Sequence, residues 1–242
     1  MIKIEKIDVN GFESAIRGMR NPLNSWDRSD SAFGCSLSIC DSCDDSHSFY
    51  EVGDNDLDLM HRLFKGGTEH RKYLRFITVT MDITAPLYWW KEFDTYKVGT
   101  VANSCSTMHK IHAKEFELDD FSCEHLTDEW DEEDDCGYAH SNSVVYYNSE
   151  YGNTPKDILN FIVEALNHYR KMFLETKDKK YWWNMIQLLP SSYNQKRTVM
   201  LNYEVAVNII RQRKGHKLDE WHVLVDELMK LPYLKEIAGL GE

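Results

Sequence analysis

Two polar residues toward the C-terminus have types and spacing that suit an elongated ligand. Asn202 and Arg213 lie in a segment, Leu188–Trp221, whose apolar residues recur at helical spacing. On one helix they would share a side about 16 Å apart, because eleven residues make about three turns. That distance is about the reach of a nucleotide or a flavin, and a guanidinium binds phosphate well. The alternative interpretation is a core helix with a solvated polar face.

A second polar set falls in a stretch rich in Thr, Ser, Asn and Gly. It offers one cation and several hydroxyl or amide groups: Lys97, Thr100, Asn103, Ser104, Ser106 and His109. Such a loop can hold a phosphate through charge-assisted and neutral hydrogen bonds. Because the chain has no Gly-rich phosphate-binding loop, a plain polar loop is the alternative.

Two further stretches, one rich in cysteine and one rich in acidic residues, are candidate metal sites. Cys35, Cys40 and Cys43 have the spacing of plant-type ferredoxins, but neighbouring acids would add negative charge around a thiolate cluster. A fourth ligand would have to be Cys105, Cys123 or Cys136. Residues 117–135 hold eleven Asp or Glu and no Lys or Arg, without the pattern of an EF-hand loop. We therefore expect free thiols, a solvated acidic segment and no metal.

Composition excludes several classes of protein. The formal net charge of -12 argues against broad nucleic-acid binding, which needs a basic surface. No apolar run approaches the length of a membrane span, and the acidic, strand-like N-terminus does not resemble a signal peptide, so we expect a cytoplasmic protein. No nucleophile elbow, zinc-protease motif or dinucleotide fingerprint appears, and the corresponding hydrolase and oxidoreductase functions have no support.

The N-terminal half is predicted to alternate strands and helices. We expect a strand over residues 2–9, a helix over Phe12–Met19, a loop over 24–53, a helix over Asp54–Phe64 and a strand over Tyr73–Ile83. The last strand is dense in β-branched and aromatic residues. Ala85-Pro86 then opens a helix, since proline is tolerated in a first helical turn. A loop is expected from Asp94 to His109.

The C-terminal half is predicted to be mostly helical. A helix begins at Thr154-Pro155, a capping threonine followed by proline, and continues to about Phe173. Tyr181–Leu188 is a second helix. Leu188–Trp221 is interpreted as a loop that turns into a long helix, with apolar positions Met200, Leu201, Val205, Ile209 and Ile210. Leu218–Met229 is the last long helix, and one α+β domain over 1–242 is the simplest organisation.

The downstream motif has a recognisable spacing. Leu189-Pro190 is followed by Asn202, by Asn208 six residues on and by Arg213 five further. Far upstream, a long strand ends in Ala85-Pro86 and leads into a helix and a polar loop. This arrangement resembles the flavin-dependent thymidylate synthases, in which the same signature occurs without a gap. The resemblance covers about residues 1–20, 54–109 and 184–230, and leaves poorly matching insertions at about 21–53 and 110–153.

The resemblance implies a role for each matching residue. His70 stands before Ala85-Pro86 at the distance of a family histidine that touches the flavin. By resemblance, the flavin contacts are His70, Asn202 and Asn208, and the nucleotide contacts are Lys97, Asn103, Ser106 and Arg213.

The chain departs from the family at its Arg-His-Arg-x-x-Ser motif. Aligned without a gap from Ala85-Pro86, Thr95-Tyr96-Lys97 stands in place of the triplet. With one inserted residue, Tyr96-Lys97-Val98 replaces it, and Asn103 and Ser106 match the motif. Either way at least two cations that hold FAD and dUMP phosphates in the family are absent. Lys97, Arg71, Arg75 or Arg197 would have to replace them.

The resemblance implies an α+β fold with a central antiparallel sheet and a mostly helical C-terminal half. It implies an enzyme that methylates dUMP or a related nucleotide, with FAD as cofactor and methylenetetrahydrofolate and NADPH as co-substrates. It also implies a homotetramer. The alternative is a non-catalytic nucleotide-binding relative that has lost the flavin chemistry.

Overall fold

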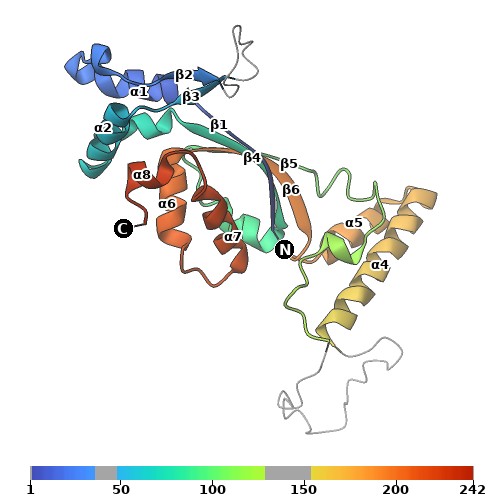
Figure 1. Ribbon diagram of the computed structural model, residues 1–242. Helices are drawn as coiled ribbons and strands as arrows, with labels where there is room; N and C mark the ends of the chain where they lie inside the picture. The colour runs from blue at the N-terminus through green and yellow to red at the C-terminus, as the bar shows by residue number, and fades with distance from the viewer. Residues whose placement is uncertain (1, 36–47, 129–153, 242) are drawn as a thin grey trace. The chain divides into compact units, whose positions relative to one another are not determined.

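The computed structural model describes residues 2–35, 48–128 and 154–241 of the chain (Figure 1). These residues divide into two compact units, which are described separately. Unit 1 comprises Met1–Lys3, Thr84–Glu92 and Ser104–Lys196, and unit 2 comprises Ile4–Ile83, Phe93–Asn103 and Arg197–Glu242. The single-domain organisation of residues 1–242 therefore stays a prediction.

A four-stranded antiparallel sheet supports the candidate site. Its strands are β1 (Lys3–Asn10), β4 (Thr78–Pro86), β6 (Asn194–Asn202) and β5 (Thr100–Ser104), in the order β1-β4-β6-β5. In β4, Val79, Met81 and Ile83 are fully buried and alternate with partly exposed residues, because successive side chains of a strand point to opposite faces. The predicted α+β fold with a central antiparallel sheet is confirmed.

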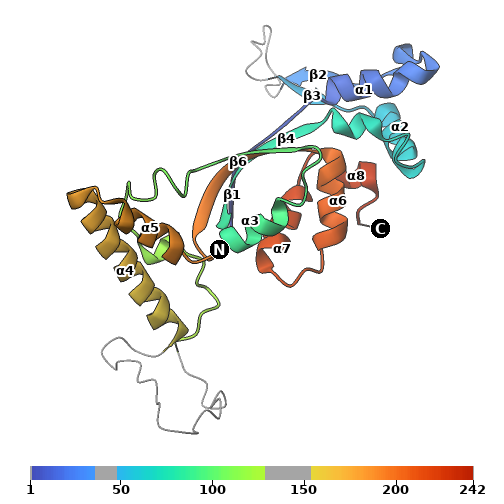
Figure 2. The same ribbon diagram turned by 180° about the vertical axis from the view of Figure 1, so that it is seen from behind.

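Three C-terminal helices pack together in unit 2. They are α6 (Tyr203–Arg213), α7 (Asp219–Leu228) and α8 (Leu234–Ala238), and α6 contacts both of the others (Figures 1 and 2). Their shared core includes Tyr203, Trp221 and Leu234, all fully buried. The Tyr203 hydroxyl donates to the Pro232 carbonyl at 2.8 Å, which joins the start of α6 to the turn before α8.

The N-terminal part of unit 2 contains a hairpin that the sequence did not reveal. Helix α1 (Phe12–Arg20) and helix α2 (Asp54–Lys65) lie as predicted. Between them, where a loop over 24–53 was predicted, β2 (Ala32–Cys35) pairs antiparallel with β3 (Ser48–Glu51). The loop prediction was wrong because the Ser- and Asp-rich composition of this stretch hides the short strands.

A buried ion pair ties these N-terminal elements together. Arg20 Nε lies 2.6 Å from Asp56 Oδ1, and the side chains are 5% and 0% exposed. The hydroxyls of Ser29 and Ser31 donate to Asp56 Oδ2 at 2.6 and 2.7 Å. Burial acts to raise the pKa of Asp56, but the hydrogen bonds from Ser29, Ser31 and Arg20 outweigh it and hold that pKa below its usual value.

Three further boundaries differ from the sequence predictions. Residues Lys72–Arg75 form a short 3-10 helix, so the strand predicted from Tyr73 begins only at Thr78 and includes Pro86. Helix α3 (Leu87–Phe93) starts directly after that proline. The predicted loop Asp94–His109 contains β5.

The predicted long helix of Leu188–Trp221 is a strand followed by a helix. Residues 194–202 form β6, in which Val199 and Leu201 are buried at alternating positions. Helix α6 starts at Tyr203. Asn202 is therefore both the last residue of β6 and the N-cap of α6, and Arg213 is the last residue of α6. The prediction was wrong because two apolar neighbours, Met200 and Leu201, fit either period.

Unit 1 is built around two helices that the sequence predicted. They are α4 (Pro155–Thr176) and α5 (Lys179–Leu188), which pack along each other (Figure 2). The Thr154 side chain accepts from Asp157 N–H, and the Asp157 side chain accepts from Thr154 N–H, so the predicted cap is a reciprocal capping box. A core of six residues joins the helices to the preceding loop: Ile111, Phe116, Phe121, Leu159, Leu166 and Met185.

None of the helices within the described ranges has the length and apolarity needed to cross a membrane. Among the same residues, no group of three or more His, Cys, Asp or Glu side chains could hold a metal ion. Cys40, Cys43, Cys136 and residues 129–135 of the acidic segment lie outside the described residues.

Candidate functional site

The start of α6 is capped by one of the predicted site residues. Asn202 ends β6, and its side-chain oxygen accepts a hydrogen bond from Val205 N–H at 3.1 Å. The chain turn at residues 94–99, here called the 94–99 turn, packs against this cap. Gly99 has φ +85, and a Cβ added there would lie 2.8 Å from Asn202 Nδ2. Glycine is required at 99 by both its backbone conformation and this close approach.

The other end of α6 is joined to the same turn. Arg213 Nε donates to the Tyr96 hydroxyl at 3.0 Å, and that hydroxyl donates to Gln212 Oε1 at 2.9 Å. The Arg213 guanidinium carbon lies 4.4 Å from the ring centroid of Trp221 and 5.6 Å from that of Tyr96. Such contacts fix the plane of a guanidinium, since it stacks on aromatic faces.

The aromatic rings beside Arg213 pack against one another. Trp221 on α7 is fully buried, stacks on Phe93 with centroids 6.3 Å apart and meets Tyr96 edge-on at 5.9 Å. Phe93 is buried as well. The 94–99 turn therefore contacts α6 at Asn202 and again at Arg213, the two ends of the helix.

Lys97 lies between these two contact points. Its side chain is exposed and has no ion pair with any residue that the structure describes. Asn208 lies between the same ends on α6 and is half-buried. Of the predicted site residues, Asn202, Asn208 and Arg213 lie along α6 and its cap, and Lys97 lies in the turn that contacts the two ends of this helix.

A charged pair stands at the first turn of α6. Arg71 Nη2 lies 2.9 Å from Glu204 Oε1, and the two side chains are 14% and 13% exposed. Glu204 Oε2 is buried and has no hydrogen-bond partner among the described residues. Burial, with the Glu204 carboxylate nearby, raises the pKa of Tyr73 far above its usual value, and the Tyr73 hydroxyl donates to the Met60 carbonyl at 2.6 Å.

The remaining predicted residues occupy simpler positions. His70 is exposed beside Arg71, and its backbone N–H donates to the Gly67 carbonyl at 3.1 Å. Asn103 is exposed on the edge strand β5. Ser106 belongs to unit 1, where its hydroxyl oxygen accepts from Met108 N–H and His109 N–H at 3.3 and 2.8 Å. In the structure Ser106 caps a turn.

Solved structures resemble this chain over nearly its whole length. Thymidylate synthase X from Helicobacter pylori, solved with FAD and dUMP, matches with a TM-score of 0.59 and 15% identity over 98% of this chain and 97% of that one. The chain has the fold of flavin-dependent thymidylate synthase. A second structure of the Helicobacter pylori enzyme, also complexed with FAD and dUMP, matches with a TM-score of 0.58 and 15% identity over 97% of both chains. No protein-family model and no curated protein sequence matches the chain.

Several residues around the site were missed from the sequence. The sequence marks Tyr96 only as a replacement within the Arg-His-Arg motif, Gly99 only as a loop residue and Trp221 only as the end of a segment. Glu204, two positions after Asn202, had no assigned role. The glycine after Lys97-Val98 was a usable signal, because an isolated glycine in a polar loop often marks a close backbone approach.

Proposed function

We propose that the protein binds dUMP or a related nucleotide beside FAD and methylates that nucleotide with reduced FAD and a folate carbon donor. The observation that carries this proposal is the fold similarity, over nearly the whole of both chains, to proteins solved with FAD and dUMP. Within this chain it is supported by the 94–99 turn, which contacts both ends of α6 and so lines one helix with polar groups.

Arg213 is the nucleotide-binding residue of the proposal, with Lys97, Asn103 and Ser106 as further contacts. Tyr96 and Trp221 hold the Arg213 guanidinium in one plane before the ligand arrives. A preorganised guanidinium loses less side-chain entropy when it binds a phosphate. Lys97 adds an exposed cation within the same turn.

His70, Asn202 and Asn208 are the proposed flavin contacts. Their amide and imidazole groups fit the carbonyl and ring-nitrogen atoms of a flavin, which need both donors and acceptors. Asn202 uses its oxygen in the helix cap, so its Nδ2, which lies beside Gly99, is the donor left for a ligand. The flavin would supply hydride chemistry, while these residues orient it and NADPH and methylenetetrahydrofolate serve as co-substrates.

A second candidate function is nucleotide binding without flavin chemistry. Glu204 favours it, because this carboxylate stands in the first turn of α6, where a helix N-terminus would otherwise attract an anionic cofactor. Arg71, the cation beside it, is already paired with Glu204. On this proposal the nucleotide binds at Arg213 and FAD does not bind.

The absorption spectrum and a pair of titrations separate the two candidates. The flavin proposal expects bound flavin in purified protein, or a rise in thermal midpoint with added FAD, together with a rise on adding dUMP. Stabilisation by dUMP alone, in colourless protein unaffected by FAD, supports the second candidate. If neither FAD nor any nucleoside monophosphate shifts the midpoint, both candidates are wrong.

We also propose a homotetramer. Val101, on the edge strand β5, is 61% exposed, and Val98, just before this strand, is 90% exposed. An unpaired strand edge with exposed apolar residues is normally covered by another chain or element. Light scattering after gel filtration tests this proposal, which expects four chains per particle. A monomer at micromolar concentration would refute it.

A further inference from the structure

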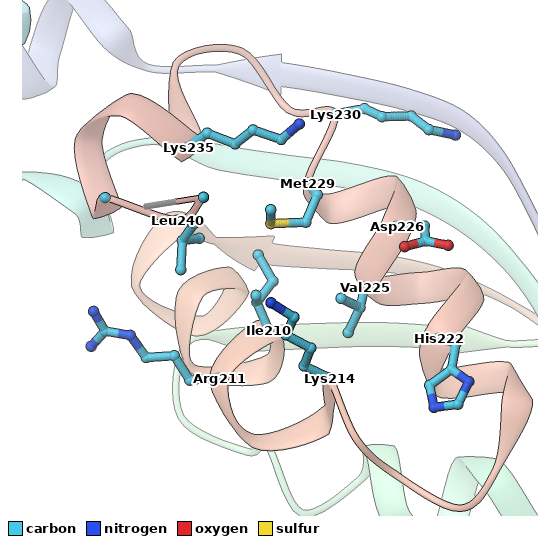
Figure 3. Close-up of a pocket in the computed structure, with 12 residues that line it drawn as sticks. Ile210, Arg211, Lys214, His222, Val225, Asp226, Met229, Lys230, Lys235 and Leu240 are labelled. Carbon is cyan, nitrogen blue, oxygen red and sulfur yellow. The ribbon is translucent and has the colours of Figure 1, made fainter.

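A cleft lies among α6, α7 and α8, and none of its lining residues is assigned to FAD or dUMP. Its volume is about 840 Å³, which is within the usual range of about 300–1,000 Å³ for small-molecule sites (Figure 3). Ile210, Val225 and Met229 form its apolar floor and point toward one another in Figure 3. All its lining residues belong to unit 2.

The rim of this cleft is basic. Its charged lining residues are Arg211, Lys214, Lys230, Lys235 and one carboxylate, Asp226. Lys230 is paired with Glu227 at 2.6 Å. The other three cations have no carboxylate within ion-pair distance in the described parts of the chain. In a chain of net charge -12, three cations around one hollow, none paired with a described carboxylate, favour an anionic ligand.

Arg213 does not line this cleft. Arg211 and Lys214 are three positions apart and therefore share one side of the helix. Arg213 instead contacts Tyr96 and Trp221. Arg211 is held in place by stacking on Phe64, with its guanidinium carbon 5.0 Å from the ring centroid.

The basic surface continues beyond the cleft. A smaller hollow of about 370 Å³ shares Arg211 and Gly239 with it and is also lined by Lys65 and Arg71. The wall common to both hollows is the end of α8, where Gly239 has φ +59 and Leu240 N–H donates to the Lys235 carbonyl at 3.0 Å. A ligand seated on the apolar floor therefore lies beside Arg211, Lys214 and Lys235.

We propose that this cleft binds a small organic polyphosphate of the nucleoside diphosphate class, as a ligand distinct from the nucleotide at Arg213. Such a ligand carries about three negative charges at neutral pH, which match Arg211, Lys214 and Lys235. Its base can cover the floor of Ile210, Val225 and Met229, since aromatic rings bury well against aliphatic side chains. The proposal does not depend on flavin binding.

Calorimetric titration with ADP tests the site. The double variant Lys214→Glu/Lys235→Glu should weaken ADP binding at least about 100-fold, because each of the two charge-assisted phosphate contacts contributes about tenfold or more. The matched control is Lys217→Glu, an exposed lysine that does not line the cleft, which should change ADP affinity by less than about threefold. Adenosine and inorganic pyrophosphate should each bind more weakly than ADP.

Two further ADP titrations distinguish this cleft from the proposed FAD and dUMP site. ADP binding should persist in Arg213→Ala and in the presence of saturating FAD and dUMP. Loss of ADP binding under either condition would place ADP at the flavin and nucleotide site and overturn the proposal. Equal ADP affinity in the double variant and in the unmodified protein, with both folded by circular dichroism, would overturn it as well.

Discussion

Arg213 Nε and the Tyr96 hydroxyl lie 3.0 Å apart, across 117 positions of sequence. This contact joins the C-terminal end of α6 to the 94–99 turn, and Gly99 joins the same turn to Asn202 at the other end. The tyrosine stands where the resembling family has part of its cationic motif. The hydrogen bond to Tyr96 and the stack on Trp221 hold the Arg213 guanidinium in one orientation.

The Tyr96 hydroxyl is expected to matter for ligand binding as well as for stability. Tyr96→Phe removes both the acceptor for Arg213 and the donor to Gln212. We expect a loss of about 1–3 kcal/mol in the free energy of unfolding, the usual net value of two hydrogen bonds, and a several-fold weaker dUMP affinity. Urea unfolding and calorimetry measure the two effects. Tyr169→Phe is the control, because the Tyr169 hydroxyl has no hydrogen-bond partner within the described ranges; equal effects in both variants would speak against the role of Tyr96.

Two glycines allow the strain at the 94–99 turn to be separated from its contact. Gly99 and Gly67 both have positive φ, +85 and +104, but only Gly99 would place a Cβ against Asn202, with nothing within 4 Å at Gly67. Gly67→Ala should cost about 1 kcal/mol from backbone strain alone. Gly99→Ala should cost about 1–3 kcal/mol more, because the cap and the turn must move apart. Similar midpoints for the two variants in urea would mean that the turn does not pack on Asn202.

Asp56 should make the stability of unit 2 sensitive to acid. Its pKa is held below the usual value in the folded protein, so its contribution is fully present above the unfolded pKa, about 4, and is lost as pH falls through the folded pKa. Asp56→Asn should cost about 3–5 kcal/mol at pH 7, since Arg20 is left buried without its partner. Urea unfolding at pH 7 and pH 3 checks both statements. The variant should lose less stability than the unmodified protein between these pH values, and parallel losses would refute the assignment.

The sequence predicted an element correctly where residues close to its end along the chain fix that end. Thr154-Pro155 predicted the start of α4 because a cap depends only on residues within one turn. The β6–α6 boundary was missed, since Met200 and Leu201 fit a strand or a helix until β4 and β5 select the strand.

The candidate site was predicted in part. Asn202, Asn208 and Arg213 came from a spacing that resembles a family, and the structure places all three on α6 or its cap. Their partners could not be predicted in this way. The Tyr96–Arg213 contact and the basic cleft with Lys214 and Lys235 both depend on how distant segments pack, which spacing along the chain does not encode.

The most direct measurement of the central claim is the dUMP affinity of two arginine variants. Arg213→Ala removes the guanidinium held by Tyr96 and Trp221, whereas Arg211→Ala removes a neighbouring guanidinium on another side of α6. By calorimetry, Arg213→Ala should weaken dUMP binding by at least about 2 kcal/mol, or about 30-fold, and Arg211→Ala should leave it unchanged. Unchanged dUMP affinity in Arg213→Ala would contradict the account.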